Sequence, residues 1–250
     1  MSGPRVAGLG GIVGLFVLVG VWQFLGVAVF DDSGIVPPPT AIVSEMRADG
    51  WDFYSANTST TVREAATGWV WGNVLAVGVA ALFVLLPFTE KALMRLAVAS
   101  YCLPIVAIGP ILQILFPGDT PKVILAALSV FFVTLIAMLL GLRSADTTSI
   151  DLVHAYGGGA MAKLRKVRLW ASLPAVFAGL RIAGPAAVLG AIIGEYTGGE
   201  SGLGVAMINS QQALRVERTW GIALVATAVA AIGYGIPALV ERLVTPWART

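Results

Sequence analysis

Charged residues are scarce in this sequence. Of its 250 residues, 12% are Asp, Glu, Lys or Arg and 57% are hydrophobic. An ordinary soluble domain carries about one quarter charged residues. The mean hydropathy is correspondingly high, at +0.85. This composition indicates that water is not the main solvent of the chain. The net charge is only +2. A nucleic-acid-binding protein would carry clustered basic residues on the surface of a soluble core, so the composition also argues against nucleic-acid binding.

Cysteine and histidine are nearly absent. Cys102 has no partner for an internal disulfide, so the fold needs no oxidising compartment. One histidine, His154, and one distant cysteine do not make a metal site. The sequence offers no nucleophile and base that can be paired. We therefore expect no metal site and no catalytic residues in this chain.

The sequence also lacks a phosphate-binding loop. Three consecutive glycines, Gly157 to Gly159, are followed by Ala160 and Met161 rather than by Lys and Ser or Thr, and no Gly-Lys pair occurs anywhere. We expect that the chain does not bind ATP through such a loop.

Long stretches without charge are abundant. A membrane-spanning helix needs about 20 mostly apolar residues, and an uncharged run of this length is also too long for the apolar core of a typical signal peptide. The pattern predicts an all-α polytopic membrane protein with a single transmembrane domain over residues 1–250. Its six predicted spans are residues 7–30, 65–89, 96–118, 123–142, 174–194 and 220–240.

The distribution of Lys and Arg predicts the orientation. With six spans, ten of these residues fall on the side that holds both termini and residues 143–173, and five fall on the other side. Cytoplasmic loops carry the excess of positive charge. We therefore expect both termini and the 143–173 loop to be cytoplasmic. On the other side, residues 205–220 are expected to form one helix.

The loop contains a polar, basic stretch, DLVHAYGGGAMAKLRKVRLWASLP, at residues 151–174. A short helix is expected to begin at Asp151, because an acid is favoured near a helix N-terminus. The glycines permit a bend, a helical pattern resumes over residues 160–170, and Pro174 suits the first turn of the next span. Together these features predict an elbow that a soluble partner can hold.

At these residues the chain resembles the binding-protein-dependent ABC transporter permeases. Their "EAA" loop has Glu-Ala-Ala, three residues, Gly, nine residues and Ile-x-Leu-Pro, and here Gly157 takes the glycine position. Asp151 replaces the Glu, Leu152 and Val153 the two Ala residues, and Trp170 the Pro. Three further segments resemble the nitrate/sulfonate/taurine branch of these permeases. They are VPPPTAI at 36–42, FAGLRIA at 177–183 and GEYTGGESGLG at 194–204.

The resemblance implies a type I ABC importer permease fold in a bacterial inner membrane. It implies a second permease subunit, the same or a different chain, two ATPase subunits on the cytoplasmic side, which bind the ATP and Mg²⁺, and a solute-binding protein outside. The ATPases would receive a coupling helix from the elbow. The residues expected to couple to them are Asp151, Leu152, His154, Ala155, Tyr156, Gly157, Gly158, Gly159, Lys163 and Arg165.

Polar residues in or beside the spans are candidates for the solute pathway. Arg181 and Glu195 belong to the fifth span and its outer end, and an ionisable group in a membrane is by default a functional hypothesis. Gln113 and Asn73 either line the pathway or bond between helices, and bonding is the simpler interpretation.

Two other classes compete with the permease. An ion-coupled secondary transporter usually places acids deep in its helices, and spans one to four and six contain none. A membrane-embedded enzyme would need a motif that this sequence lacks. The substrate stays open among nitrate, sulfonates, taurine, vitamin precursors and aromatic compounds.

Overall fold

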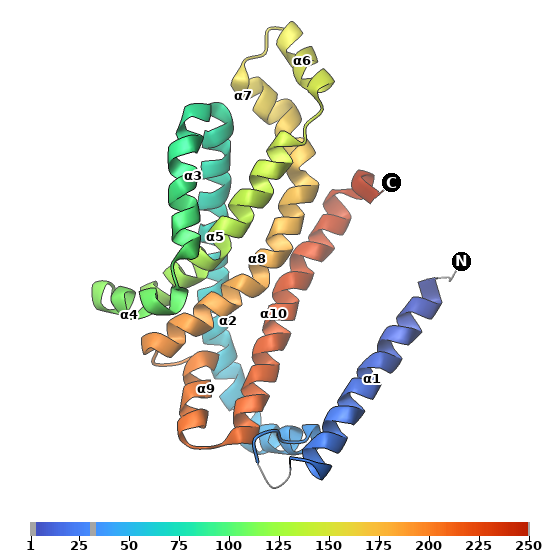
Figure 1. Ribbon diagram of the computed structural model, residues 1–250, viewed down its shortest axis with the longest axis vertical. Helices are drawn as coiled ribbons and strands as arrows, with labels where there is room; N and C mark the ends of the chain where they lie inside the picture. Colours follow the sequence, from blue (N-terminus) through green and yellow to red (C-terminus); the bar gives the residue numbers. More distant parts are fainter. Residues whose placement is uncertain (1–3, 31–33, 250) are drawn as a thin grey trace. The chain divides into compact units, whose positions relative to one another are not determined.

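The computed structural model of the protein describes residues 4–30 and 34–249, and every regular element in these residues is helical (Figure 1). The prediction of an all-α fold is therefore confirmed. The long helices are α1 (Pro4–Ala28), α2 (Pro39–Leu85), α3 (Pro87–Cys102), α5 (Thr120–Arg143), α8 (Leu169–Gly198) and α10 (Val216–Val244). The shorter elements are α4 (Ile105–Leu115), α6 (Thr147–Ala155), α7 (Ala160–Lys163), a π-helical turn (Leu164–Arg168), α9 (Leu203–Gln212) and a 3₁₀ turn (Pro246–Arg249).

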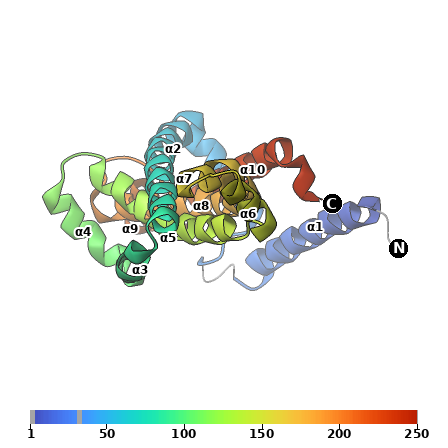
Figure 2. The same cartoon turned by 90° about the horizontal axis from the view of Figure 1, so that it is seen from above.

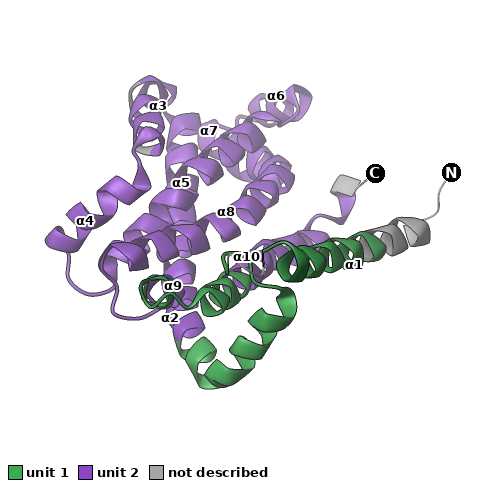
Figure 3. Ribbon diagram, turned by 60° about the horizontal axis from the view of Figure 1, so that its bottom comes forward, with its two compact units in different colours: residues 1–56, 206–225 green, residues 57–205, 226–250 purple. Residues whose placement is uncertain are grey.

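The chain forms two compact units (Figure 3). The smaller unit comprises residues 1–56 and 206–225, and the larger unit comprises residues 57–205 and 226–250. Helices α2, α9 and α10 each continue from one unit into the other along the chain.

Helices α5 and α8 pack along each other in the larger unit. Glycines lie where they meet: Gly141 on α5 faces Ser172, and Gly179, Gly190 and Gly194 on α8 face Ala137, Ala126 and Lys122. As residue numbers rise along α8 they fall along α5, so the pair is antiparallel. A glycine in a helix interface lets two backbones approach closely. The sequence thereby favours a tight seam in place of interdigitated large side chains.

Helix α2 runs beside α5 in the parallel direction. Gly68 faces Ala126, and Gly72 faces Ala127 further along the same two helices. Past these glycines the seam changes to large side chains, with Phe83 and Leu135 buried in one apolar cluster. This three-helix arrangement of α2, α5 and α8 holds the polar groups described below.

The segment predicted as the third span is not a single helix. It divides at Pro104 into the end of α3 and the whole of α4, with Leu103 extended at φ −71° and ψ 129°. Proline lacks the backbone donor of an interior helical residue and disfavours helical geometry in the residue before it. Helix α4 lies at one edge of the larger unit, to the left in Figures 1 and 2.

Two further expectations about helix ends differ from the structure. Pro174 does not begin a helix, because the helical backbone continues from Ala160 to Gly198. The π-helical turn inside this stretch changes the hydrogen-bond spacing shortly before the proline. Residues 205–220 do not form one helix, because they are divided between α9 and α10 at Leu214, whose φ is +54°.

Four helices among the described residues are long and apolar enough to cross a membrane. They are residues 39–85, 120–143, 160–198 and 216–244. Residues 13–28 and 105–115 form shorter apolar helices. A polytopic membrane protein follows, and the count of six spans stays a prediction.

The smaller unit is held by aromatic and charged contacts. The rings of Trp22 and Trp220 lie 5.4 Å apart, and Gly26 packs against Pro38. Arg218 forms an ion pair with Asp49. These contacts join α1, the start of α2 and the start of α10.

Candidate functional site

The elbow begins earlier than the sequence predicted. Asp146, and not Asp151, is the N-cap residue, because its Oδ2 accepts the backbone N–H of Ser149 at 3.0 Å. This hydrogen bond holds the pKa of the Asp146 carboxyl below its usual range. An aspartate at this position satisfies a backbone donor that has no partner inside the helix. Asp151 lies one turn further on and is exposed to solvent.

Two of the three consecutive glycines have a defined role in ending α6. Gly157 adopts φ +78°, a left-handed conformation that favours glycine. The N–H of Gly157 donates to the carbonyl of His154 at 2.9 Å, and the N–H of Gly158 donates to that of Val153 at 2.8 Å. This pair of bonds is a Schellman motif. Gly159 begins α7, and a side chain there would meet open space.

The surface of the elbow is apolar in part. No residue of α6 is buried, and Tyr156 and Leu152 expose 86% and 59% of their surface. A hollow of about 210 Å³ lies between α6 and α7, lined by Leu152, Val153, Tyr156, Gly158, Ala162 and Lys166. The elbow lies beyond the end of α5, at the top of the larger unit in Figure 1.

The structure gathers all ten predicted coupling residues in this elbow. Eight of them are exposed, namely Asp151, Leu152, His154, Ala155, Tyr156, Gly157, Gly159 and Arg165, and Gly158 and Lys163 are partly buried. Two large apolar side chains at the surface, next to a hollow, form a surface on which another protein can dock.

All four pathway candidates make contacts between helices, and two of them, Asn73 and Gln113, do so through side-chain amides. The side chain of Asn73 donates to the carbonyl of Trp69 at 2.6 Å and accepts the hydroxyl of Thr134 at 2.7 Å, which joins α2 to α5. The side chain of Gln113 donates to the carbonyl of Gly194 at 3.4 Å, which joins α4 to α8.

Arg181 is paired within the larger unit. Its guanidinium forms an ion pair with Glu241 of α10, and about a third of its side chain is exposed. Three residues further along α8, Gly184 lies against the backbone of Gly233 on α10. The positive charge in α8 therefore belongs to the α8–α10 contact.

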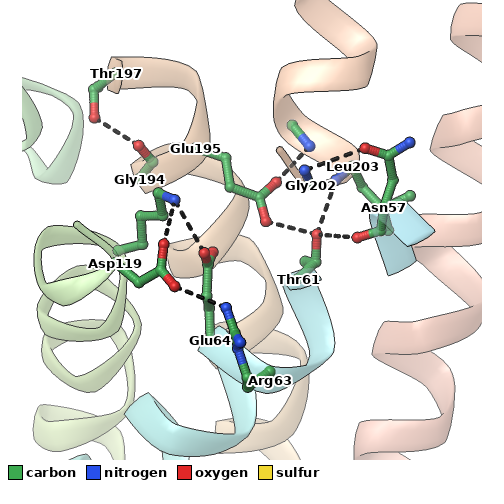
Figure 4. Close-up of polar contacts among 12 residues, drawn as sticks. Asn57, Thr61, Arg63, Glu64, Asp119, Gly194, Glu195, Thr197, Gly202 and Leu203 are labelled. Carbon is green, nitrogen blue, oxygen red and sulfur yellow. Dashed lines mark hydrogen bonds and ion pairs between the residues drawn. The ribbon is translucent and has the colours of Figure 1, made fainter. Parts of the chain in front are cut away.

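Glu195, the fourth candidate, is almost fully buried at the end of α8. Its Oε1 accepts the hydroxyl of Thr61 at 2.6 Å, and its Oε2 accepts the backbone N–H of Gly204 at 2.5 Å (Figure 4). Two neighbouring amides are bound in the same way. The N–H of Leu203 donates to Oγ1 of Thr61 at 2.9 Å, and that of Gly202 donates to Oδ1 of Asn57 at 3.2 Å.

We call this arrangement the α9 clamp. It consists of the side chains of Asn57, Thr61 and Glu195 and the backbone N–H groups of Gly202, Leu203 and Gly204. The first N–H groups of a helix have no partner inside it, and here side chains from α2 and α8 supply the acceptors. A carboxylate at a helix N-terminus is also favoured by the helix dipole.

The glycines of the GEYTGGESGLG segment make room for the clamp. Gly202 adopts φ +120°, and a side chain at this position would collide with the Glu195 carboxylate. A Cβ on Gly204 would lie 2.7 Å from the carbonyl oxygen of Ile192. A Cβ on Gly194 would lie 2.7 Å from the Cα of Lys122. Gly202 and Gly204 are therefore constrained by close approach to Glu195, and Gly194 is constrained by close approach to Lys122.

A buried ion pair lies next to the clamp. Nζ of Lys122 is 3.1 Å from Oε1 of Glu64 and 2.9 Å from Oδ1 of Asp119, and Oδ2 of Asp119 pairs with exposed Arg63 at 2.8 Å. The hydrogen bond from Lys122 keeps the pKa of the Asp119 carboxyl below its usual range. Oε2 of Glu64 is buried, and no group in the described residues donates a hydrogen bond to it.

Sequence reasoning missed most of this cluster. Lys122 and Glu64 served only as charged boundaries of predicted spans. A signal was present in α2, because Asn57, Thr61 and Glu64 recur at helical spacing and so share one face. Polar residues on one helical face just before a long apolar run predict a buried polar contact.

The chain is similar to proteins of one family over most of its length. The family described as binding-protein-dependent transport system inner membrane component matches residues 72–249. A probable ABC transporter permease protein of Haemophilus influenzae is 28% identical over 230 residues, which are 91% of this chain and 94% of that protein. A riboflavin transport system permease protein of Chloroflexus aurantiacus is 34% identical over 160 residues, covering 63% of this chain and 59% of that protein.

A third relative comes from the branch that the sequence resembles. The putative aliphatic sulfonates transport permease protein of Bacillus subtilis is 24% identical over 235 residues, 92% of this chain and 84% of that protein. The family match covers the elbow, the α5–α8 seam and the glycine-rich segment of the clamp. The chain therefore belongs to the binding-protein-dependent ABC transporter permeases, as its elbow and glycine-rich segment indicated, and it has their all-helical, polytopic fold.

Proposed function

We propose that this permease is the membrane subunit of an ATP-driven importer, and that the elbow couples it to a separate ATPase. The chain would form a pathway for a small solute together with a second permease subunit. A solute-binding protein would deliver the solute on the outer side. ATP hydrolysis and the Mg²⁺ that it requires would belong to the ATPase, so this chain would not itself be an enzyme.

The exposed apolar surface of α6 carries this proposal. A short helix whose large side chains are exposed gains nothing from packing within its own chain. Leu152 and Tyr156 are the two most prominent such side chains, and they border a hollow of about 210 Å³. A partner that fills this hollow would remove both side chains from water.

The basic residues beside the elbow support a cytoplasmic location. Lys163, Arg165, Lys166 and Arg168 lie in α7 and the π-helical turn that follows it, and such clusters occur on the cytoplasmic side of membrane proteins. The proposal therefore places the protein in a bacterial inner membrane, with both termini in the cytoplasm. Residues 1–3 and 250 lie outside the described residues, so the location of the termini rests on sequence charge.

The buried acids favour the permease over an ion-coupled transporter. Glu64 is paired with Lys122, and both carboxylate oxygens of Glu195 accept hydrogen bonds from Thr61 and Gly204. An acid that exchanges an ion with the pathway needs access to it, and these two are about 1% exposed. Membership of the permease family points the same way.

Co-purification tests the proposal. The tagged chain is purified in detergent from its native host, and the proteins that remain bound are identified. We expect an ATPase in the eluate of the native chain and its loss from the variant Leu152→Asp/Tyr156→Asp. Leu214→Asp is the matched control, because Leu214 is 85% exposed but lies in the turn between α9 and α10. A folded chain that retains no ATPase would contradict the proposal.

A further inference from the structure

Helix α8 connects the elbow to the α9 clamp. The helical backbone is continuous over 39 residues from Ala160 to Gly198, which corresponds to a length of about 58 Å at the usual rise per residue. Its first residues follow the glycines of the elbow, and Glu195 lies in its last turn. The elbow and the carboxylate of Glu195 therefore lie at the two ends of one continuous stretch of helix.

The start of α9 is attached to its surroundings through side chains. The amides of Gly202, Leu203 and Gly204 each donate to a side-chain oxygen. Two of the acceptors, on Asn57 and Thr61, come from α2, and one, on Glu195, comes from α8. The three bonds form together only while residues 57–61 of α2 and the end of α8 keep their present spacing, because a hydrogen bond weakens steeply with distance and angle.

The carboxylate of Glu195 is central to this arrangement. It contacts both α2, through Thr61, and α9, through Gly204. Hydrogen bonds to a charged group are shorter and stronger than those between neutral groups. Gly202 and Gly204 leave room for the carboxylate, because a side chain at either residue would meet it.

The clamp also lies where the chain leaves the larger unit. On α2 that unit begins at Asn57, which is a clamp residue, and on α9 it ends at Val205, directly after Gly204. The clamp is therefore adjacent, along the chain, to both segments that continue into the smaller unit.

We propose that Glu195 is a positioning residue of the transport cycle, which holds the start of α9 to α2 and releases it when the ATPase displaces α8. The proposal rests on the proposed coupling of the elbow to an ATPase. Glu195 would act on α9 through Thr61 and Gly204 and would not contact the solute. It would link the cytoplasmic elbow to the segment that begins at Gly202.

Hydrogen exchange of the clamp amides tests this proposal without knowledge of the solute. The complex with its ATPase is reconstituted in lipid nanodiscs, and deuterium uptake of Gly202, Leu203 and Gly204 is measured without nucleotide and after trapping with ATP and vanadate. We expect uptake to become on the order of tenfold faster in the trapped state, since a hydrogen bond to a charged group contributes at least that factor. Equal uptake in both states would overturn the proposal.

Two variants separate a positioning role from a structural one. In Glu195→Ala, which removes both acceptor oxygens that Glu195 contributes to the clamp, we expect fast exchange in both states, while ATP hydrolysis by the complex persists. Glu200→Ala is the matched control, because it removes an exposed carboxylate from the same loop, and it should behave as the native chain does. A nucleotide response in Glu195→Ala equal to the native response would show that the carboxylate does not position α9.

The order of measurements separates this proposal from the one on which it rests. ATPase binding and ATP hydrolysis by the native complex are recorded first. If no ATPase binds, the proposed coupling fails. If an ATPase binds and hydrolyses ATP while the clamp amides exchange equally in both nucleotide states, the coupling stands and the role of Glu195 is wrong.

Discussion

The Nζ atom of Lys122 lies 3.1 Å from Oε1 of Glu64, and the two side chains expose 4% and 1% of their surface. They come from α5 and α2, 58 positions apart in the chain. Removing one member of such a pair leaves the other charge buried without compensation.

Lys122→Met should therefore destabilise the protein by about 3–5 kcal/mol, because the Glu64 carboxylate loses its buried cation. Thermal unfolding in detergent measures the effect. The double variant Lys122→Met/Glu64→Gln should recover most of the loss. Arg63→Gln is the control, since the exposed pair of Arg63 and Asp119 contributes at most about 1 kcal/mol. Equal losses in Lys122→Met and Arg63→Gln would contradict the importance of burial.

The consecutive glycines of the elbow should differ in their tolerance of substitution. Gly157→Ala forces a side chain into a left-handed conformation, which costs about 1–2 kcal/mol, and should weaken ATPase binding. Gly159→Ala, which meets open space, should bind as the native chain does. Binding affinities of the purified partners measure both. A Gly157→Ala chain that binds at native strength would show that the Schellman motif is dispensable.

Asn73 should contribute to helix packing and not to solute passage. The hydrogen bond between Asn73 and Thr134 joins two helices, and such bonds in membrane proteins contribute about 0.6 kcal/mol on average. A double-mutant cycle with Asn73→Leu and Thr134→Val, followed by unfolding in detergent, should give a coupling energy of this size. Uptake by the Asn73→Leu chain should keep the native solute preference, and a changed preference would instead place Asn73 in the pathway.

The stability of α6 should fall in acid. The N–H of Ser149 lowers the pKa of Asp146 in the folded chain, so the cap stabilises α6 fully above the unfolded pKa of about 4. This contribution is lost as the pH falls through the lower, folded pKa. Hydrogen exchange of α6, corrected for the intrinsic effect of pH, measures the change. Asp146→Asn, which caps without titrating, should remove this dependence, and its persistence would exclude Asp146 as the cause.

The sequence predicts the helical class and the elbow because both depend on local patterns. Apolar runs specify helices in lipid, and glycines after a short polar segment specify a bend at Gly157. The clamp was beyond such reasoning, because Asn57 and Gly202 are 145 positions apart. Glu195 was recognised as unusual, but its contacts depend on how α2, α8 and α9 meet. The division at Pro104 was missed because charge alone defined that span.

The glycine-lined seam between α5 and α8 has a mechanical consequence. Gly141, Gly179, Gly190 and Gly194 present only hydrogen atoms to the facing helix. Large interdigitated side chains resist sliding, since each must leave its hole before the next position is reached. Glycines that face small side chains keep two helices in contact but oppose shear along their length less than large side chains do, and small shear between packed helices is a common form of domain motion. The seam therefore holds the two helices together while offering little resistance to sliding of one helix along the other.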